Sequence, residues 1–313
     1  MSNPEALTFP AADALGLEPH LPPPFSRKGA EEQKNISQQQ QNDAAAAPST
    51  TARGGERKTE TKRNKPKPFV TLTFAISLDS SLSLAPGTRT ILSGPQSKAM
   101  THYLRSRHAA ICVGVGTAIA DDPGLNCRLL SASPSKPQHQ PRPIVIDPNA
   151  RWALKEDAKV LQLARAGLGL APFIAVASAT SPDDQTRELL ERHGGKYIFI
   201  DQPAAAGNDQ NTSGAVRFNW DDVLAVVMSE GLESIMIEGG GQIINSLLAA
   251  PENELIDSVI VTIAPTWLGQ GGVVVSPPRT VGADGELVSP VRLTGVSWHP
   301  LGEDVVMCGK ILR

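Results

Sequence analysis

The chain has 313 residues, 40% of them apolar, and a formal net charge of −3, so it is long enough for one large or two ordinary domains. The small negative charge gives no electrostatic reason to expect nucleic acid or an anionic membrane as a partner. No apolar run reaches the roughly 18–20 residues needed to span a bilayer.

Residues 1–67 are expected to be disordered. They contain three prolines at 22–24, a glutamine run at 38–41 and an alanine run at 44–47, and they offer too little apolar area to offset the entropy of ordering. The N-terminus has no basic region followed by an apolar stretch, so neither a secretory signal nor a transit peptide is expected. Three scattered cysteines without a C-x-x-C motif argue against disulfides and zinc and favour the reducing cytoplasm.

One ordered domain is expected over residues 68–313. Alternating, β-branched and continuous apolar runs predict strands at 69–77, 109–116, 143–147, 172–178, 196–200, 233–238, 256–269, 291–300 and 304–312. Helical spacing predicts helices at 93–108, 157–167, 181–195, 220–231 and 240–250, with Ser93 and Ser181 as caps of the first and third. Residues 202–214 are expected to be a polar surface insertion. Strands that alternate with helices and end in a strand-only tail predict an α/β fold: a mainly parallel central sheet flanked by helices, with antiparallel C-terminal strands.

A glycine triplet follows the strand expected at 233–238. In IMIEGGGQIINSLL, Gly239, Gly240 and Gly241 stand between that strand and an apolar helix. Glycines let a ligand approach the backbone, and a helix N-terminus offers unpaired N–H groups that suit a phosphate. The motif is neither G-x-G-x-x-G nor a Walker A loop, and a tight turn is the simpler alternative. Three glycines exceed what a turn needs because each costs conformational entropy, so anion binding is favoured.

Two carboxylates end predicted strands, where ligands collect in open α/β sheets. Glu238 could accept hydrogen bonds from an amino-substituted ring, or it could cap a neighbouring loop. Asp79, in SLDSS after the first strand, could be catalytic or could cap a loop. The residues alone leave both pairs of alternatives open.

The stretch VGVGTAIADDPGLNCRL (113–129) repeats this layout. Asp122 followed by Pro-Gly predicts a type I turn, which accounts for that aspartate. Thr117 offers a hydroxyl, and Asp121 is a surplus carboxylate for which ribose hydroxyls are favoured over loop N–H groups. Arg105 and Arg128 could each hold a phosphate with a planar fork of donors, or each could be a solvated surface side chain.

Together, FVTLTFAISLDSSLS, SGPQSKAMTHYLRSRHAAICVGVGTAIADDPGLNCRL and SIMIEGGGQIINSLL resemble the riboflavin-biosynthesis reductases over about residues 69–313. The resemblance implies a dihydrofolate-reductase-like fold and NADPH-dependent reduction of the ribosylamino side chain of a phosphorylated pyrimidine, by hydride transfer to C1′ of the opened sugar. It also implies a homodimer.

The resemblance also implies roles for individual residues. The cofactor-binding positions are Ala75, Thr117, Asp121, Val216, Gly239, Gly240, Gly241, Gln242 and Ile243. The substrate-binding positions are Arg105, Leu125, Arg128 and Glu238. Asp79 and Glu238 are the candidates for catalysis, with Lys98 or water as other sources of the proton.

Two departures from the family pattern stand out. Ser81 occupies the place of a usual basic residue after SLDS, and the H-x-E and P-C-x-x-C motifs of the zinc deaminase fused to bacterial relatives are absent. A monofunctional reductase without a metal is therefore expected. The alternatives are a related oxidoreductase acting on another pterin or pyrimidine, and a non-catalytic nucleotide-binding module.

Overall fold

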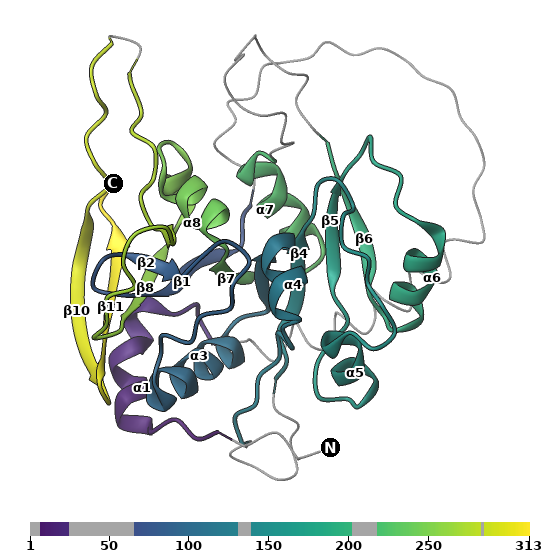
Figure 1. Cartoon of the computed structure of the whole chain (residues 1–313), viewed down its shortest axis with the longest axis horizontal. Helices are drawn as coiled ribbons and strands as arrows, with labels where there is room; N and C mark the ends of the chain where they lie inside the picture. The colour runs from purple at the N-terminus through teal and green to yellow at the C-terminus, as the bar shows by residue number, and fades with distance from the viewer. Residues whose placement is uncertain (1–6, 25–65, 131–138, 202–217, 283–284) are drawn as a thin grey trace.

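The computed structural model of the protein describes residues 7–24, 66–130, 139–201, 218–282 and 285–313 (Figure 1). The strands are β1 (Phe69–Ile76), β2 (Ser81–Ser83), β3 (Ala110–Gly114), β4 (Arg142–Ile146), β5 (Phe173–Ala177), β6 (Lys196–Ile200), β7 (Ser234–Gly239), β8 (Ser258–Ile263), β9 (Val273–Val274), β10 (Leu293–Leu301) and β11 (Asp304–Ile311). The helices are α1 (Ala11–Leu17), α3 (Pro95–Arg107), α4 (Val115–Asp121), α5 (Lys159–Arg165), α6 (Asp184–Arg192), α7 (Trp220–Ser229) and α8 (Gly241–Leu248), with 3₁₀ turns η1 (Glu18–His20) and η2 (Glu252–Leu255).

The larger sheet has nine strands in the order β10-β11-β8-β1-β7-β3-β4-β5-β6 (Figure 1). The strands from β8 to β6 run parallel, whereas β11 pairs antiparallel with β8 and β10 pairs antiparallel with β11. β2 and β9 form a small antiparallel sheet of their own. The predicted α/β class, with a mainly parallel sheet and antiparallel C-terminal strands, is confirmed.

Side chains of the central strands alternate between two faces of the sheet, and helices cover both faces. On β3, Ala110 and Cys112 pack in the core that contains α7 and α8, whereas Ile111 and Val113 pack in the core that contains α4, α5 and α6. A third cluster joins α1 and α3 to β7, β8 and the C-terminal strands. Burial on both faces explains why these strands appear in the sequence as continuous apolar runs.

Several predictions about element ends are wrong, among them the strand expected at 256–269, which ends at Ile263. The strand expected at 109–116 ends at Gly114, and α4 begins at Val115, because a short apolar run does not distinguish a strand from the first turn of a helix. The N-cap of α3 is Gly94 instead of Ser93, and its N–H donates to Asp304 at 2.8 Å. The N-cap of α6 is Asp183 instead of Ser181, and its carboxylate accepts the Thr186 N–H at 2.8 Å.

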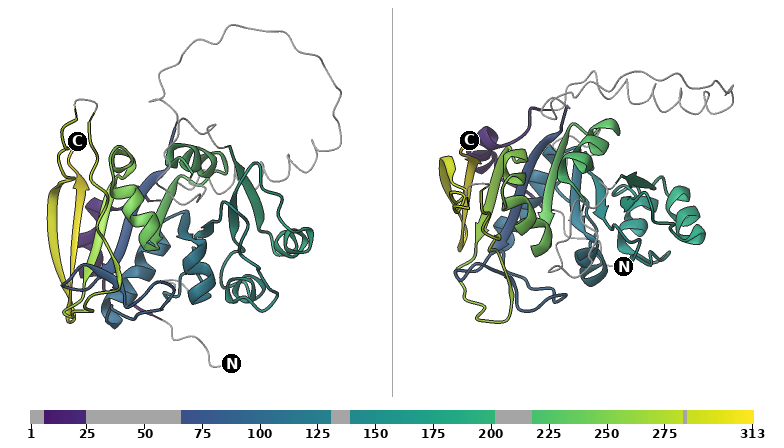
Figure 2. Two further views of the ribbon diagram at one scale, coloured as in Figure 1. Left: turned by 45° about the horizontal axis from the view of Figure 1, so that its top comes forward. Right: turned by 90° about the horizontal axis from the view of Figure 1, so that it is seen from above.

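The prediction that residues 1–67 are disordered is wrong for residues 7–24. These residues form α1 and η1 and lie beside α3 and the C-terminal strands (Figure 2). Leu17 and Leu21 are buried there, and the burial of these apolar side chains offsets the entropy of ordering that the composition alone suggested would prevail. Residues 25–65 and the predicted insertion at 202–214 lie outside the described residues. No helix in the described part of the chain is long and apolar enough to cross a membrane.

Candidate active site

A cleft of about 1470 Å³ lies where the central parallel strands end. Its lining includes Ala75 of β1, Gly114 of β3, Ile146 of β4 and Glu238 of β7. The carboxyl edge of a parallel sheet is the usual place for a ligand in this class of fold. Most of the predicted site residues line this one cleft, namely Ala75, Arg105, Thr117, Asp121, Leu125, Arg128, Glu238, Gly240, Gly241, Gln242 and Ile243. Val216 lies outside the described residues.

The glycine triplet is required by the backbone and by its neighbours. Gly239 and Gly240 have φ angles of 118° and 80°, in the region that disfavours other residues. A Cβ on Gly241 would lie 2.3 Å from Cγ1 of Val273, because the β2–β9 sheet packs on the first turn of α8. A Cβ on Gly240 would lie 3.2 Å from Oγ1 of Thr117. The triplet therefore brings the start of α8 against α4 as well as shaping the turn.

The start of α8 offers amides to the cleft. Its first helical hydrogen bond runs from Ile244 N to Gly240 O at 3.1 Å, so the three preceding N–H groups have no helical acceptor. Those three residues, Gly241, Gln242 and Ile243, all line the cleft. This geometry suits the anion-binding role that the sequence predicts, although the packing of Gly241 against Val273 accounts for that glycine without a ligand.

Glu238 and Arg105 form a bidentate ion pair at the floor of the cleft. Nε and Nη2 of Arg105 donate to the two carboxylate oxygens of Glu238 at 2.8 and 2.7 Å, and Nη1 donates to Asn126 O at 3.1 Å. Burial by itself lowers the pKa of Arg105, but the Glu238 carboxylate outweighs it and the net shift is upward. In this structure the fork of Arg105 holds the Glu238 carboxylate, an arrangement that neither of the two alternatives left open by the sequence described.

Arg128 is held beside a buried histidine. Its Nε and Nη2 lie 3.1 and 2.9 Å from Nε2 of His102, and both residues line the cleft. Burial, together with the nearby Arg105 and Arg128 charges, lowers the pKa of His102 to about 2. A neutral His102 therefore accepts from Arg128 and adds no charge of its own, a role that the scattered histidines of the sequence did not indicate.

The loop between α4 and β4 departs from the predicted turn. Asp122 is the left-handed C-cap of α4, with φ 39° and ψ 59°, and its carboxylate accepts the Lys159 N–H at 3.1 and 3.3 Å. Asp122 therefore anchors α5, and the type I turn prediction fails because helix α4 extends as far as Asp121. Leu125 follows with φ 48° and is buried, while Asp121 faces the cleft as expected.

Asp79 caps a loop. Its carboxylate accepts the Ser77 hydroxyl and the N–H groups of Leu268 and Gly269, the last two at 3.2 and 2.8 Å. These bonds lower the pKa of Asp79, which holds it as an acceptor. Asp79 is not among the residues that line the cleft, so the geometry favours capping over catalysis. Ser81, the departure from the family pattern, is buried at the start of β2, and its N–H donates to Oγ of Ser77 at 3.0 Å.

Positive charge dominates the lining of the cleft. Among the described residues, the cationic side chains that line it are Arg89, Lys98, Arg105, Arg128, Arg151 and Lys159, against the carboxylates of Asp121, Glu238 and Glu252. The whole chain carries a net charge of −3, so the excess of cations is local and favours anionic ligands. Arg89, Arg151 and Lys159 were not among the predicted site residues.

A helical periodicity signals part of this site. Lys98, Thr101, His102 and Arg105 line the cleft and are spaced i, i+3, i+4 and i+7 along α3. The opposite face of α3 carries apolar side chains into the core. The polar stripe of an amphipathic helix usually faces solvent, and here it faces the site.

Comparison with known families decides where the chain belongs. The family model of the RibD C-terminal domain matches residues 68–307. The chain belongs to this family.

Relatives within the RibD C-terminal family are named as one enzyme. The protein called 2,5-diamino-6-ribosylamino-4(3H)-pyrimidinone 5′-phosphate reductase in Debaryomyces hansenii is 38% identical over 245 residues, which cover 78% of this chain and 90% of the relative. The protein of the same name in Saccharomyces cerevisiae is 37% identical over 245 residues, which cover 78% and 87%. The named relatives are reductases.

Solved structures agree with the family. The riboflavin biosynthesis reductase Rib7 of Saccharomyces cerevisiae superimposes with a TM-score of 0.60 at 33% identity, over 80% of this chain and 92% of that one. RibD of Acinetobacter baumannii reaches a TM-score of 0.58 at 22% identity, over 79% of this chain and 59% of that one, and this likeness concerns the fold. The α/β fold with a mainly parallel sheet is thus shared with RibD-type reductases.

Proposed function

We propose that the protein is the NADPH-dependent reductase of riboflavin biosynthesis, which converts 2,5-diamino-6-ribosylamino-4(3H)-pyrimidinone 5′-phosphate into the ribitylamino product. The observation that carries the proposal is the cationic cleft at the carboxyl edge of the sheet, which unites the Arg105–Glu238 pair with the amides that begin α8. Relatives 38% and 37% identical carry this activity in their names.

The residues present fit NADPH on one side of the cleft. The amides of Gly241, Gln242 and Ile243 would hold its pyrophosphate, since they begin α8 and face the cleft. On the neighbouring helix α4, Asp121 would accept hydrogen bonds from its ribose hydroxyls and the Thr117 hydroxyl would donate to its phosphate oxygens. When bound, NADPH would supply the hydride for C1′ of the opened sugar.

The residues around Arg105 and Arg128 fit the substrate. Arg128 would hold the 5′-phosphate, because His102 fixes its guanidinium at the wall of the cleft. Glu238 would accept hydrogen bonds from the amino groups of the pyrimidine, and Arg105 orients that carboxylate by holding both of its oxygens. The chain's contribution to the rate is then to hold the sugar carbon close to the hydride donor and to keep bulk water from the open imine.

The Arg105–Glu238 pair limits which group donates the proton. A carboxylate that accepts two hydrogen bonds from a cation is an acceptor, so Glu238 is a poor proton donor in this state. Lys98 of α3 lines the same cleft, and it or a water molecule would supply the proton.

The protein is further proposed to act as a homodimer in the cytoplasm. Strand β10 ends the sheet with Val296 and Trp298 exposed, at 42% and 57%, which suits a contact with a second copy. The three cysteines are free and buried, which suits a reducing compartment.

The test is the loss of NADPH absorbance on mixing the purified protein with the diamino-ribosylamino substrate. We expect decay with this substrate and none with dihydrofolate. Decay with dihydrofolate alone would favour a related pterin reductase. Binding of NADPH without decay on any substrate would favour a nucleotide-binding module.

A further inference from the structure

The N-terminal strap, residues 7–24, precedes the part of the chain that matches the family model, which begins at residue 68. It does not line the cleft. We propose that the strap is a positioning element for substrate: it holds the loop 125–130 and helix α3 in the arrangement that presents Arg128. That the positioned ligand is the substrate rests on the proposed function. That the strap restrains the loop and α3 rests on contacts within the chain.

The strap clamps the backbone at Arg128 itself. Leu7 N donates to Arg128 O at 3.1 Å, and Leu130 N donates to Leu7 O at 2.9 Å. Leu7 and Leu129 thereby form a parallel bridge. Two hydrogen bonds on either side of Leu129 fix the peptide that follows the Arg128 side chain, so Leu7 restrains the direction in which that side chain leaves the backbone.

The strap also contacts α3, the helix whose His102 holds the guanidinium group of Arg128. The Glu18 carboxylate accepts from Arg107 and from the Tyr103 hydroxyl, both on α3, and Arg107 Nη2 donates to Pro22 O at 3.2 Å. The Phe9 ring stacks on Tyr103 with centroids 5.2 Å apart. Helix α3 also carries His102, the partner of the Arg128 guanidinium, so the strap contacts both supports of that arginine.

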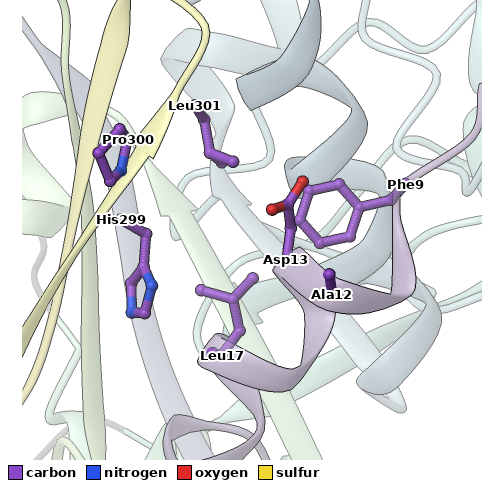
Figure 3. A pocket seen from close by; sticks show the side chains of 8 residues that line it. Phe9, Ala12, Asp13, Leu17, His299, Pro300 and Leu301 are labelled. Atoms are coloured by element: carbon purple, nitrogen blue, oxygen red, sulfur yellow. The ribbon is translucent and has the colours of Figure 1, made fainter.

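An apolar anchor keeps the strap in place. Leu17 and Leu21 are buried in the cluster that includes Met236 of β7 and Ile260 of β8. Helix α1 packs closely on β10 at Gly16, where a Cβ would lie 2.7 Å from the His299 ring. Beside this contact the packing is incomplete, and a cavity of about 140 Å³ remains between α1 and β10 (Figure 3). The buried Leu17 and Leu21 therefore anchor the strap on the sheet.

A strap with a purely structural role would stabilise the protein without changing KM for the substrate. Leu7 separates the two roles, because it lies ten residues before the buried Leu17 and reaches the site through its backbone. In the full-length protein, Leu7→Pro removes the N–H that donates to Arg128 O and leaves Leu17, Leu21 and Glu18 in place. Leu7→Ala keeps both backbone hydrogen bonds and is the matched control.

The experiment measures KM for substrate, kcat and the Kd of NADPH for both variants, with hydrogen exchange at the Leu130 amide. For Leu7→Pro we expect KM to rise about threefold to tenfold, the effect of one lost hydrogen bond, with kcat and the NADPH Kd unchanged. Exchange at Leu130 should be faster than in Leu7→Ala, which should match the unmodified protein.

Two results would overturn the proposal: an unchanged KM in Leu7→Pro, or a rise in KM matched by an equal rise in the NADPH Kd. If the unmodified protein does not turn the substrate over, the proposed function fails and exchange decides the inference alone. Equal exchange at Leu130 in both variants would then show that the strap does not hold the loop.

Discussion

Arg105 and Arg128 face one cleft, but their guanidinium groups have different partners. Arg105 donates three hydrogen bonds, two to Glu238 and one to Asn126. Arg128 contacts the neutral ring of His102. The neutral His102 ring adds no charge of its own beside Arg128, which suits an attraction of this arginine for an anion. We therefore propose that Arg128 recognises the phosphate and that Arg105 positions the Glu238 carboxylate.

Arg128→Ala tests this assignment. Loss of a charge-assisted contact worth about 1.5–3 kcal/mol should raise KM for substrate roughly tenfold to a hundredfold. The Kd of NADPH, measured by fluorescence titration, should stay within about twofold of its normal value, which is well under 1 kcal/mol. Arg165→Ala, which removes an exposed arginine paired with Glu156, is the control. Equal losses for substrate and cofactor would show that Arg128 serves both.

The glycine triplet gives a second test at the scale of one atom. Gly241→Ala places a methyl group 2.3 Å from Cγ1 of Val273, so the start of α8 or strand β9 must move. Overpacking of this kind costs about 1–3 kcal/mol, and we expect the NADPH Kd to rise by about tenfold or more. Adding Val273→Ala removes the obstacle and should restore most of the affinity. A double variant as weak as Gly241→Ala would show that the glycine is needed by the cofactor itself.

The site lies where strands end and helices begin. Helix α8 begins where β7 ends, helix α4 begins where β3 ends, and both starts meet at Gly240 and Thr117. Apolar patterns located β3, β7 and α8 but not α4, which begins inside the run expected to be a strand. The ends of some elements depend on single capping contacts. Asp183 caps α6 because its carboxylate reaches Thr186 N, and the sequence also offered Ser181, two residues earlier.

Urea unfolding distinguishes the two candidate caps of α6. Asp183→Ala should lower the free energy of unfolding by about 1 kcal/mol with an unchanged m value, because the Thr186 N–H loses its acceptor. Ser181→Ala should change it by less than about 0.5 kcal/mol. The reverse order would place the cap at Ser181 after all.

On the scale of the whole molecule, buried histidines link stability to pH. His20, His102, His108 and His139 all have pKa values below the ordinary 6.5, with burial as the largest cause. For His108 the pKa falls to about 4, and its ring bridges Thr71 and the Leu104 carbonyl. The folded chain therefore holds these rings neutral at a pH where the unfolded chain would protonate them.

The buried histidines therefore make the folded chain less stable in acid. A lowered histidine pKa contributes full stability above pH 6.5, and that contribution is lost as the pH falls toward the folded-state value. Each such group contributes up to about 1.4 kcal/mol per pH unit, so urea midpoints should fall steadily from pH 6.5 to pH 5. His108→Gln should make that fall shallower. A midpoint that stays constant over this range would contradict the prediction.

The sequence by itself determined the class of fold and predicted many of the residues that line the cleft. Alternating and continuous apolar runs require particular faces to be buried, and glycines with positive φ and polar residues at strand ends are local features of the chain. Only the tertiary structure decided which partners these residues have. Glu238 and Arg105 are 133 positions apart, and Asp79 meets Gly269 from another segment. The strap also depends on contacts with distant residues, because Leu17 and Leu21 gain their stabilisation only when α3 and the sheet bury them.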